Sequence, residues 1–301
     1  MNIDAKPMLH VMCGLSGSGK SSVAKDLAKR NNAIIVSSNE IREEITGTVE
    51  DQSKNNEVFQ IFHKRIKQNL ISGRDVIADA TNLTMRDRRA LLNPLQGMDI
   101  VKICVVTTKK YEDCLEDNKN RCHPVPEEVI KKQMCKFQVP FLEEGFDYIC
   151  SHFDSFNAYP DTFEKEFNLM AGLEQKNPHH TLTLGEHCTE SYLRLVKQTF
   201  DNIHSSYLIG ARLHDIGKVF TQTFDDQGIA HYYNHENVGS YYLLSHYASY
   251  SRIINICFLV NYHMLPFQWD TEKIRKKYRR IFGKYKYELL MDFHKCDLSA
   301  K

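Results

Sequence analysis

Several features that would place this 301-residue chain outside the ordinary globular proteins are missing from its sequence. No run reaches the roughly 18 apolar residues of a membrane-spanning helix, and the first residues carry no signal-peptide pattern. The nine cysteines are scattered without a CxxC pair, which favours reduced thiols over a disulfide framework. There is no low-complexity tract. We therefore expect a cytoplasmic globular protein without a membrane partner.

Strong net charge is also missing, since the formal value is +1. No global field therefore attracts nucleic acid. An enzyme that handles only a strand end nevertheless needs no more than a local basic patch. A nucleic-acid substrate is thus not excluded.

The histidines are unevenly distributed, and eleven of the 14 lie after residue 150. The chain is long enough for two domains with separate cores. This asymmetry indicates two halves with different chemistry.

The first half alternates short apolar runs with helical patterns. This alternation predicts an α/β fold with a parallel sheet and helices on both faces. The expected strands are Leu9–Cys13, Ala33–Ser37, Asp75–Ala80 and Ile100–Val106. The expected helices are Lys20–Arg30, Asn39–Thr46, Glu57–Ser72, Tyr111–Asn120 and Pro126–Val139. Residues 147–161 read as a last strand followed by a linker.

The second half shows helical patterns throughout, so we expect an all-α domain there. They are Thr162–Leu173, Leu184–Ile203, Tyr207–Ile216, Glu236–Ser249, Ser251–Tyr262, Thr271–Phe282 and Tyr285–Asp297. Breaks fall at Asn177-Pro178, at 226–228 and at Pro266. We place the two domains at residues 1–152 and 163–301.

A glycine-rich loop lies between the first expected strand and the first expected helix. Its sequence from Gly14 to Ser21, GLSGSGKS, fits the pattern G-x-x-x-x-G-K-[ST] in the required strand–loop–helix context. Backbone N–H groups of such a loop converge on phosphate oxygens, and the helix N-terminus adds a positive dipole end. The candidate nucleotide-binding residues are Gly14, Ser16, Gly17, Ser18, Gly19, Lys20, Ser21 and Ser22. Lys20 would approach the β/γ-phosphates, and the Ser21 hydroxyl would bind Mg²⁺.

Further motifs follow the loop at the ends of the next strands and on a later helix. They are Ser38–Arg42, Asp79–Leu83 followed by Arg86, Arg88 and Arg89, Glu116–Arg121 before Pro124-Val125-Pro126, and Glu144–Asp147 after Pro140. Together they resemble the phage-type polynucleotide 5′-kinases, small P-loop kinases, over roughly residues 7–150. The resemblance implies ATP and Mg²⁺ as cofactors.

The same resemblance implies roles for individual residues. Arg42 would contact the phosphate next to the acceptor nucleoside, while Asp79 and Asn82 would line the acceptor side. Arg121 would stabilise charge on the transferring phosphoryl group.

Two positions depart from the family pattern. The carboxylate base expected three residues before Arg42 is replaced by Asn39, and a lid arginine is replaced by Asp117. Glu40 is adjacent, but it points about 100° around a helix from the required direction. A missing base and a missing cation should weaken phosphoryl transfer even if nucleotide binds.

A second constellation surrounds the pair His214-Asp215, which continues into Ile216-Gly217-Lys218. In chain order its other members are residues 177–187 with His187, the run from His235 to Gly239, the run from Asn261 to Met264, Asp292, and the C-terminal run from Asp297. The set resembles the HD phosphohydrolase superfamily, and most closely HD domains joined to nucleic-acid end-processing enzymes. The match covers roughly residues 165–301.

The resemblance implies a metal centre. His187, His214, Asp215 and Asp297 would form a first site, and His235 and His263 would form a second site with Asp215 as bridge. Imidazole and carboxylate ligands suit one or two divalent ions such as Mn²⁺, Fe²⁺, Co²⁺, Ni²⁺ or Zn²⁺. Lys218 would offer a cation to a phosphate oxygen. His180 is the one further histidine expected to reach the substrate, and no thiol is expected among the ligands.

Together the two halves predict a bifunctional enzyme that heals nucleic-acid ends. A 5′-hydroxyl kinase would add the missing phosphate to RNA or DNA, and a 2′,3′-phosphoesterase would process the other end. Known HD–polynucleotide kinase fusions place the HD domain first, so the order here is reversed. Two alternatives stay open: a kinase and phosphohydrolase for small nucleotides, and a phosphohydrolase regulated by an ATP-binding domain. The basic run 273–286 favours the polynucleotide.

Overall fold

The computed structural model describes residues 6–152, 162–176, 181–199, 203–250 and 252–300. It divides into two compact units. The first comprises Met1–Gln133 and Pro140–Asp154, and the second comprises Met134–Val139 and Ser155–Lys301. Among the described residues, no helix has the length and apolar character needed to cross a bilayer.

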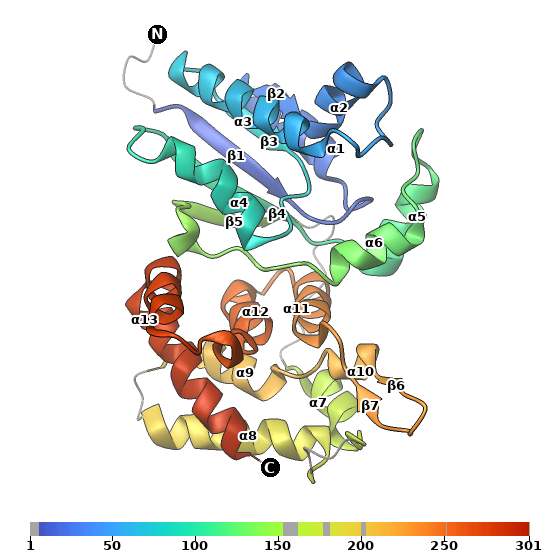
Figure 1. Ribbon diagram of the computed structural model, residues 1–301, viewed down its shortest axis with the longest axis vertical. Helices are drawn as coiled ribbons and strands as arrows, with labels where there is room; N and C mark the ends of the chain where they lie inside the picture. The colour runs from blue at the N-terminus through green and yellow to red at the C-terminus, as the bar shows by residue number, and fades with distance from the viewer. Residues whose placement is uncertain (1–5, 153–161, 177–180, 200–202, 251, 301) are drawn as a thin grey trace. The chain divides into compact units, whose positions relative to one another are not determined.

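The first unit contains one parallel sheet of five strands in the order β2-β3-β1-β4-β5 (Figure 1). Its strands are β1 (Met8–Cys13), β2 (Ile34–Ser37), β3 (Val76–Asp79), β4 (Val101–Thr107) and β5 (Tyr148–His152). Its helices are α1 (Lys20–Asn31), α2 (Ser38–Thr46), α3 (Asn55–Ile71), α4 (Met85–Leu92), α5 (Tyr111–Lys119) and α6 (Glu127–Met134), with short 3-10 turns η1 (Asn93–Leu95) and η2 (Leu142–Glu144). The α/β fold and its parallel sheet are as the sequence predicts.

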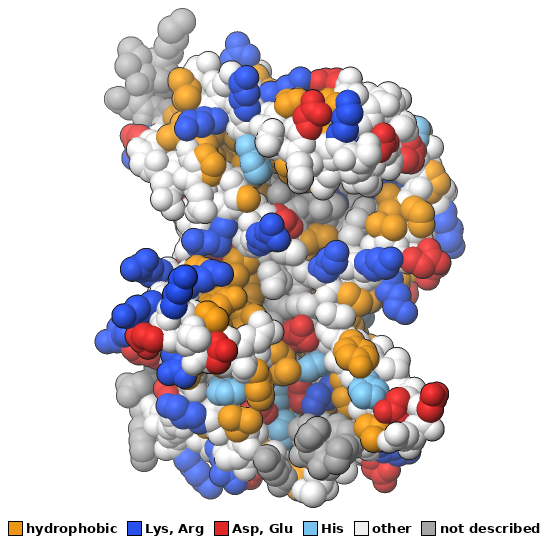
Figure 2. Space-filling view, in the orientation of Figure 1, with side chains coloured by type: hydrophobic (Ala, Val, Ile, Leu, Met, Phe, Trp, Pro, Cys, Tyr) orange, Lys and Arg blue, Asp and Glu red, His pale blue; other side chains and the backbone are white. Residues whose placement is uncertain are grey.

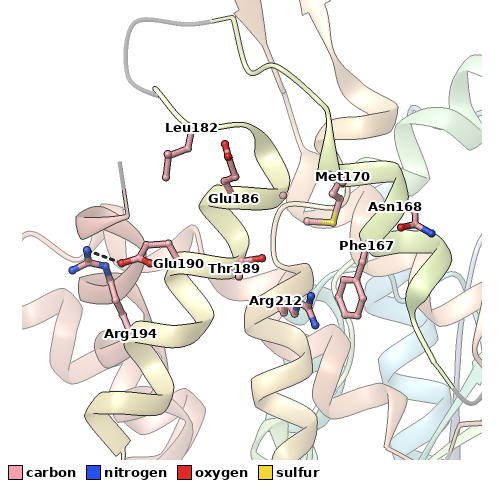
Figure 3. A pocket seen from close by; sticks show the side chains of 11 residues that line it. Phe167, Asn168, Met170, Leu182, Glu186, Thr189, Glu190, Arg194 and Arg212 are labelled. Atoms are coloured by element: carbon pink, nitrogen blue, oxygen red, sulfur yellow. Dashed lines mark ion pairs between the residues drawn. The ribbon is translucent and has the colours of Figure 1, made fainter.

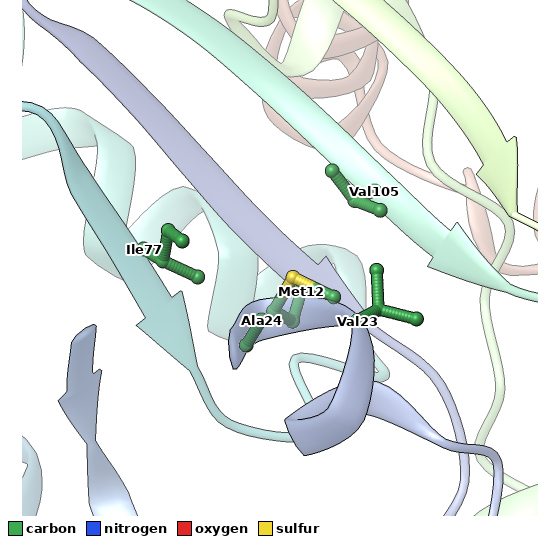
Figure 4. Close-up of a cluster of buried hydrophobic side chains, with 5 residues drawn as sticks. All are labelled: Met12, Val23, Ala24, Ile77 and Val105. Atoms are coloured by element: carbon green, nitrogen blue, oxygen red, sulfur yellow. The ribbon is translucent and has the colours of Figure 1, made fainter. Parts of the chain in front are cut away.

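A buried cluster fixes the helix that follows the glycine-rich loop. Met12 at the end of β1 and Val23 and Ala24 on α1 pack together with Ile77 of β3 and Val105 of β4 (Figure 4). Both ends of the loop are therefore anchored in the core, and the loop emerges at the carboxyl edge of the sheet, where parallel sheets bind ligands.

The second unit is almost entirely helical, as the sequence predicts. Its helices are α7 (Glu164–Ala171), α8 (Leu184–Thr199), α9 (Ser205–Leu213), α10 (Lys218–Thr221), α11 (His235–His246), α12 (Ile253–Tyr262) and α13 (Glu272–Ser299), with the 3-10 turn η3 (Leu265–Gln268). The break expected between the last two helical patterns is found at Gly283, whose φ of 70° and ψ of 171° interrupt α13. Residues 153–161 of the expected linker and 200–202 of an expected helix lie outside the described residues.

Three local features differ from the sequence prediction. A helix forms at Met85–Leu92, where Thr84 and Asp87 make a capping box. A short hairpin, β6 (Thr223–Phe224) with β7 (Ala230–His231), forms where only a break was expected, because Gly228 takes a φ of 76° in the turn.

The third difference is that α6 ends at Met134 rather than at Val139. The backbone after Met134 bonds to side chains of the second unit instead of continuing the helix. Asn237 donates to the Cys135 carbonyl, and Asn261 accepts from the Val139 N–H at 2.6 Å.

Candidate phosphate-binding loop and candidate metal centre

The glycine-rich loop runs from β1 into α1 with a shape that only glycine permits at position 17. Gly17 has a φ of 83°, and a Cβ there would lie 2.1 Å from the Cys114 carbonyl oxygen. Gly19 caps α1 in the left-handed conformation. Substitution at Gly17 would therefore displace the loop from α5.

Neighbouring elements hold the loop by hydrogen bonds. The Ser18 hydroxyl lies 2.6 Å from the Thr107 hydroxyl at the end of β4. The Gln133 side chain accepts from the Ser16 N–H at 2.8 Å and donates to the Ser16 hydroxyl at 3.0 Å. Loop position is thus coupled to the last turn of α6.

Lys20, Ser21 and Asp79 come together at the edge of the sheet. Burial lowers the pKa of Lys20 to about 8, with Asp79 acting against this shift. The Lys20 ammonium donates to the Leu15 carbonyl at 2.6 Å, and the Ser21 hydroxyl donates to an Asp79 carboxylate oxygen at 2.9 Å. A cation, a hydroxyl and a carboxylate beside a helix N-terminus suit a magnesium-bound polyphosphate. Ser22 lies exposed in the first turn of α1.

Arg42 and Asn39 interact directly on α2. Arg42 is buried, with one guanidinium nitrogen 3.0 Å from the Asn39 side-chain oxygen and the other 3.0 Å from that of Asn55. Its Nε has no hydrogen-bond partner among the described residues. The exposed Asn39 side chain is therefore tied to the arginine expected beside the acceptor.

The other expected acceptor and lid residues have distinct surroundings. Asn82 is buried and donates to the Met12 carbonyl at 2.7 Å, a contact that links the ends of β3 and β1. Arg121 follows α5, and its charge contributes, after burial, to the lowered pKa of Lys20. Asp117 pairs with Lys109. The negative charge at the position of the missing lid arginine is thus neutralised.

Arg88, one of the arginines noted after β3, is fully buried. Its guanidinium pairs with Glu144 at 2.7 Å and 2.8 Å and also donates to the Asn82 and Leu83 carbonyls. Burial raises the pKa of Glu144, and Arg88 counteracts the shift. The pair fixes the backbone after β3 and is not open to substrate. Nothing in the sequence predicts that Arg88 is buried.

The second unit brings six expected metal ligands to one place. His187 lies on α8, the pair His214-Asp215 follows α9, and His235 begins α11. His263 follows α12, and Asp297 lies on α13. Five of the six are buried and Asp297 is largely so. Figure 2 shows histidine, acidic and Lys/Arg side chains close together in a hollow of this unit.

Asp215 stands at the centre of the cluster, and its two carboxylate oxygens face different histidine pairs. Oδ2 lies 3.6 Å from His187 Nε2 and 3.3 Å from His214 Nε2. Oδ1 lies 3.0 Å from His235 Nε2 and 3.4 Å from His263 Nε2. Asp297 joins the first pair at 3.0 Å and 3.3 Å. A group of three side chains (His187, His214 and Asp297) and a group of two (His235 and His263) therefore share one carboxylate.

Each histidine of the cluster is oriented from behind by a backbone carbonyl. The Nδ1 atoms lie between 2.7 Å and 2.9 Å from carbonyl oxygens. The pairs are His187 with Ala300, His214 with Ala211, His235 with Tyr232 and His263 with Val260. An Nδ1–H donor fixes the tautomer in which Nε2 carries the lone pair. In the neutral form of each ring, the Nε2 lone pair therefore faces Asp215. Among the described residues, no hydrogen bond of good geometry is made to the buried His214 Nε2.

The carboxylates of the cluster favour the binding of a cation. Burial opposes ionisation of Asp215, but Lys218 and His214 hold the pKa of this carboxyl well below its usual range. Burial likewise acts to lower the pKa of His214, yet Cys188, Asp215 and Asp297 raise it well above its usual range. The carboxylates thus hold a proton on the cluster that a metal ion would displace.

Lys218 lies in the cluster itself. Its ammonium is 2.7 Å from Asp215 Oδ2 and donates to the Gln175 side-chain oxygen at 2.9 Å. Burial would lower the pKa of Lys218, and Asp215 raises it. The expected phosphate-binding cation is therefore paired with the central carboxylate.

Gly217 allows the loop after Asp215 to approach α11. A Cβ at Gly217 would lie 1.9 Å from the His235 carbonyl oxygen and 2.8 Å from the Gly239 nitrogen. The central carboxylate and the second histidine pair can meet because this position has no side chain.

One side chain near the cluster was missed from the sequence. Cys188, next to His187, is buried, and its sulfur lies within 4.8 Å of ligand atoms of His214 and Asp215. Its position next to His187 in the sequence was the available signal. The sequence prediction, which places no thiol among the ligands, stays a prediction. His179 and His180 lie outside the described residues.

A separate pocket of about 680 Å³ opens on the other face of α8 (Figure 3). Glu186, Thr189 and Glu190 line it from this helix, whereas His187 and Cys188 are buried on the side of the metal cluster. Arg212 lies over the Phe167 ring at 3.9 Å, and Glu190 pairs with Arg194. The pocket therefore shares no side chain with the cluster around Asp215.

Comparison with models of protein families gives a match in the first unit. A family model described as an AAA domain matches residues 9–140. With the glycine-rich loop and the order of its strands, this match defines the first unit as a P-loop kinase-like domain.

Several solved structures are also similar. A chain of the Pnkp1/Rnl/Hen1 RNA repair complex is 21% identical over 44% of this chain and 44% of that chain, with a TM-score of 0.38. A second structure of the Pnkp1/Rnl/Hen1 complex is 20% identical over 55% and 52%, with a TM-score of 0.36. A gluconokinase from Sinorhizobium meliloti 1021 is 18% identical over 49% and 84%, with a TM-score of 0.35. This chain thus spans about half of the length of the RNA-repair chains, and likenesses of this extent assign no activity.

Proposed function

We propose that the chain is a bifunctional enzyme that prepares nucleic-acid ends for joining. Its first unit would be an ATP-dependent 5′-hydroxyl kinase, and its second unit a metal-dependent 2′,3′-phosphoesterase. The observation that carries the proposal is Asp215, whose two oxygens face two separate histidine pairs. This arrangement suits a carboxylate that bridges two divalent ions.

For the kinase, Lys20 and the loop N–H groups would hold the ATP phosphates, while Ser21 and Asp79 would hold Mg²⁺. Arg42 and Arg121 would orient the acceptor phosphate and the transferred group. Asn39 has no carboxylate with which to accept the proton of the attacking hydroxyl. We therefore expect phosphoryl transfer to be slow relative to nucleotide binding.

For the phosphoesterase, His187, His214 and Asp297 would hold one ion and His235 and His263 the other, with Asp215 shared. The residues fit such ions, since four imidazoles oriented through their Nδ1 atoms turn Nε2 toward one carboxylate, with Asp297 beside two of them. Bound divalent ions would supply a water molecule of lowered pKa next to the phosphate. Lys218 would keep the central carboxylate ionised and in place.

A polynucleotide substrate is supported by the surface of α13. Its first part, up to the break at Gly283, carries Lys273, Arg275, Lys276, Lys277, Arg279 and Arg280. Lys/Arg side chains gather over this helix in Figure 2. Lys273, Arg280 and Lys284 have no ion-pair partner among the described residues. Unpaired cations along one element suit a phosphate backbone.

The proposal is tested by offering the protein oligonucleotides that carry each type of end. We expect Mn²⁺-dependent removal or opening of 2′,3′-phosphates, and slow ATP-dependent phosphorylation of 5′-hydroxyl ends. Hydrolysis of mononucleotides with no activity on oligonucleotides would favour the small-nucleotide alternative. Exchange of Lys273 and Arg280 for Glu should weaken oligonucleotide binding and lower its salt dependence. The same exchange at Lys165 and Lys197, exposed residues of α7 and α8, is the matched control.

One observation favours a second candidate function, in which ATP regulates the phosphoesterase. Gln133 holds Ser16 of the loop, and the residues that follow it in the chain, Met134–Val139, belong to the second unit. Asn237 and Asn261, each two residues from a metal-ligand histidine, bond to Cys135, Phe137 and Val139.

Under this alternative, a non-hydrolysable ATP analogue should change the phosphoesterase rate of the wild type. Gln133→Ala, which frees the loop from α6, should abolish the response while ATP still binds. An unchanged rate with saturating analogue would rule the alternative out.

A further inference from the structure

An exposed aromatic residue, Tyr233, lies two positions in the chain from a histidine of the cluster. Tyr233 is 69% exposed, the largest exposed fraction among the large hydrophobic side chains that the structure describes. It lies two residues before His235, so its Cα is at most about 7.6 Å from that of the ligand histidine. Its neighbour Tyr232 supplies the carbonyl that orients His235. The ring is thus attached to the backbone that builds the cluster.

The Tyr233 ring is held in a fixed plane by the hairpin β6–β7. It stacks on the His231 ring with centroids 5.5 Å apart and an interplanar angle of 4°. His231 is fixed in turn by Asp225, 3.0 Å from its Nε2. Asp225 also accepts from the N–H groups of Gln227 and Ile229, which closes the turn. The imidazole therefore lies parallel to the Tyr233 ring and offset from it, while most of the tyrosine ring remains open.

The segment between the hairpin and α11 is held by hydrogen bonds of the Tyr232 hydroxyl. The Tyr232 hydroxyl donates to the Gln175 carbonyl at 2.6 Å and accepts from Gln222 at 2.9 Å. Gln175 also accepts from Lys218, the cation of the metal cluster. Figure 1 shows the hairpin next to α10 and α11, the helices that begin at Lys218 and His235. The open ring and the cluster are thus parts of one rigid framework.

Isolated exposed aromatic rings are common on protein surfaces and need no explanation. This one differs because its plane is fixed by an imidazole, which is itself held by an ion pair with Asp225. A flat ring that is held in a fixed plane and is largely exposed is a stacking platform for another flat ring. In a nucleotide such a ring, the base, lies one sugar away from the phosphate.

We propose that Tyr233, backed by His231, stacks on the nucleobase next to the phosphate that the metal cluster receives. The inference rests on the proposed phosphoesterase and makes its substrate class a base-bearing phosphate ester. The second unit would recognise the terminal nucleoside and not the phosphate alone. Stacking does not read hydrogen-bonding edges, so all four bases should be accepted.

The test compares equilibrium binding of adenosine 3′-monophosphate with that of ribose 5-phosphate, which lacks a base. Calorimetry on the full chain with Mn²⁺ reads binding, and any hydrolysis during the titration is measured in parallel as released inorganic phosphate. Tyr233→Ala should weaken nucleotide binding about tenfold and leave ribose 5-phosphate binding unchanged. Tyr233→Phe and Tyr233→Trp, which keep a flat ring, should bind the nucleotide like the wild type. Nucleotide held by the P-loop contributes equally to all these proteins, because the substitutions lie in the second unit.

Tyr285→Ala is the matched control, since Tyr285 is a tyrosine of the same unit that is 48% exposed. It should change neither affinity. Equal nucleotide affinities of wild type and Tyr233→Ala would overturn the proposal, and so would an equal loss for nucleotide and ribose phosphate.

The outcome is separable from the phosphoesterase itself. Tyr233-dependent binding without hydrolysis would leave the base site standing and refute the proposed reaction. Hydrolysis at the same rate in the wild type and in Tyr233→Ala would support the proposed reaction and refute the base site. A wild type that binds neither compound would overturn the base site.

Discussion

The pairing of Lys218 with Asp215 makes a prediction that separates metal binding from folding. Asp215→Asn removes the charge beside a buried ammonium, which is 2.7 Å away and 7% exposed. Breaking one partner of a buried ion pair costs about 3–5 kcal/mol, because the remaining charge is left uncompensated. In chelator, the second unit of the variant should therefore be destabilised by about that free energy of unfolding.

The double variant Asp215→Asn with Lys218→Met removes both charges and keeps the volume of the lysine stem. Replacement of a buried pair by groups of similar shape is often neutral. The double variant should thus regain most of the lost stability. It should not regain metal, because the bridging carboxylate is still absent.

The protein contains its own probe for this experiment. Its single tryptophan, Trp269, is 2% exposed in the second unit and stacks with Tyr278 and Tyr287. Urea unfolding followed by tryptophan fluorescence reports this unit separately, as a chain with two units requires. A double variant that is as unstable as Asp215→Asn would show that the carboxylate stabilises the fold by contacts other than Lys218. Metal retained by Asp215→Asn would refute the bridging role.

Three further predictions concern ATP binding, the general base of the kinase and the proton released on metal binding. Lys20→Ala should weaken ATP binding about tenfold or more, since the loop loses its charged hydrogen-bond donor. Phosphoesterase activity should remain intact. Equal ATP affinities of the wild type and the variant, measured by calorimetry, would contradict the loop assignment. Asn39→Asp should raise turnover on a 5′-hydroxyl oligonucleotide at least about tenfold, because a positioned base contributes about 10²–10⁴-fold. Glu40→Gln should change little in the same assay, and a loss there would mean that Glu40 is the base. The carboxylates raise the pKa of His214, so adding Mn²⁺ to metal-free protein near pH 7 should release about one proton per chain. A pH indicator measures this release. No acidification would mean that the cluster does not exchange protons for metal.

The sequence predicts the elements of this protein better than the contacts between them. Strand and helix periods and the glycine-rich loop follow local rules, so the parallel sheet and the helical second half could be anticipated. The end of α6 could not, because it depends on Asn237 and Asn261, more than 100 residues away in the chain. At this position, hydrogen bonds from distant side chains to the backbone outweigh the local helix propensity.

The candidate site divides along the same line. The ligand types and their order point to a metal cluster, but the split of Asp215 between two histidine pairs is visible only in three dimensions. The pairing of Lys218 with that carboxylate and the approach of Cys188 also required the fold. Arg88 shows the opposite case, since an arginine beside expected acceptor residues proves to be a buried support.

The central claim, a pair of divalent ions held around Asp215, is tested most directly by counting metal. Metal-free protein is loaded with Mn²⁺, separated from free ion, and analysed by mass spectrometry for ions per chain. The account predicts about two ions in the wild type, about one in His263→Ala and essentially none in Asp215→Ala. A wild type that retains no ion, or an occupancy that His263→Ala and Asp215→Ala leave unchanged, would contradict it.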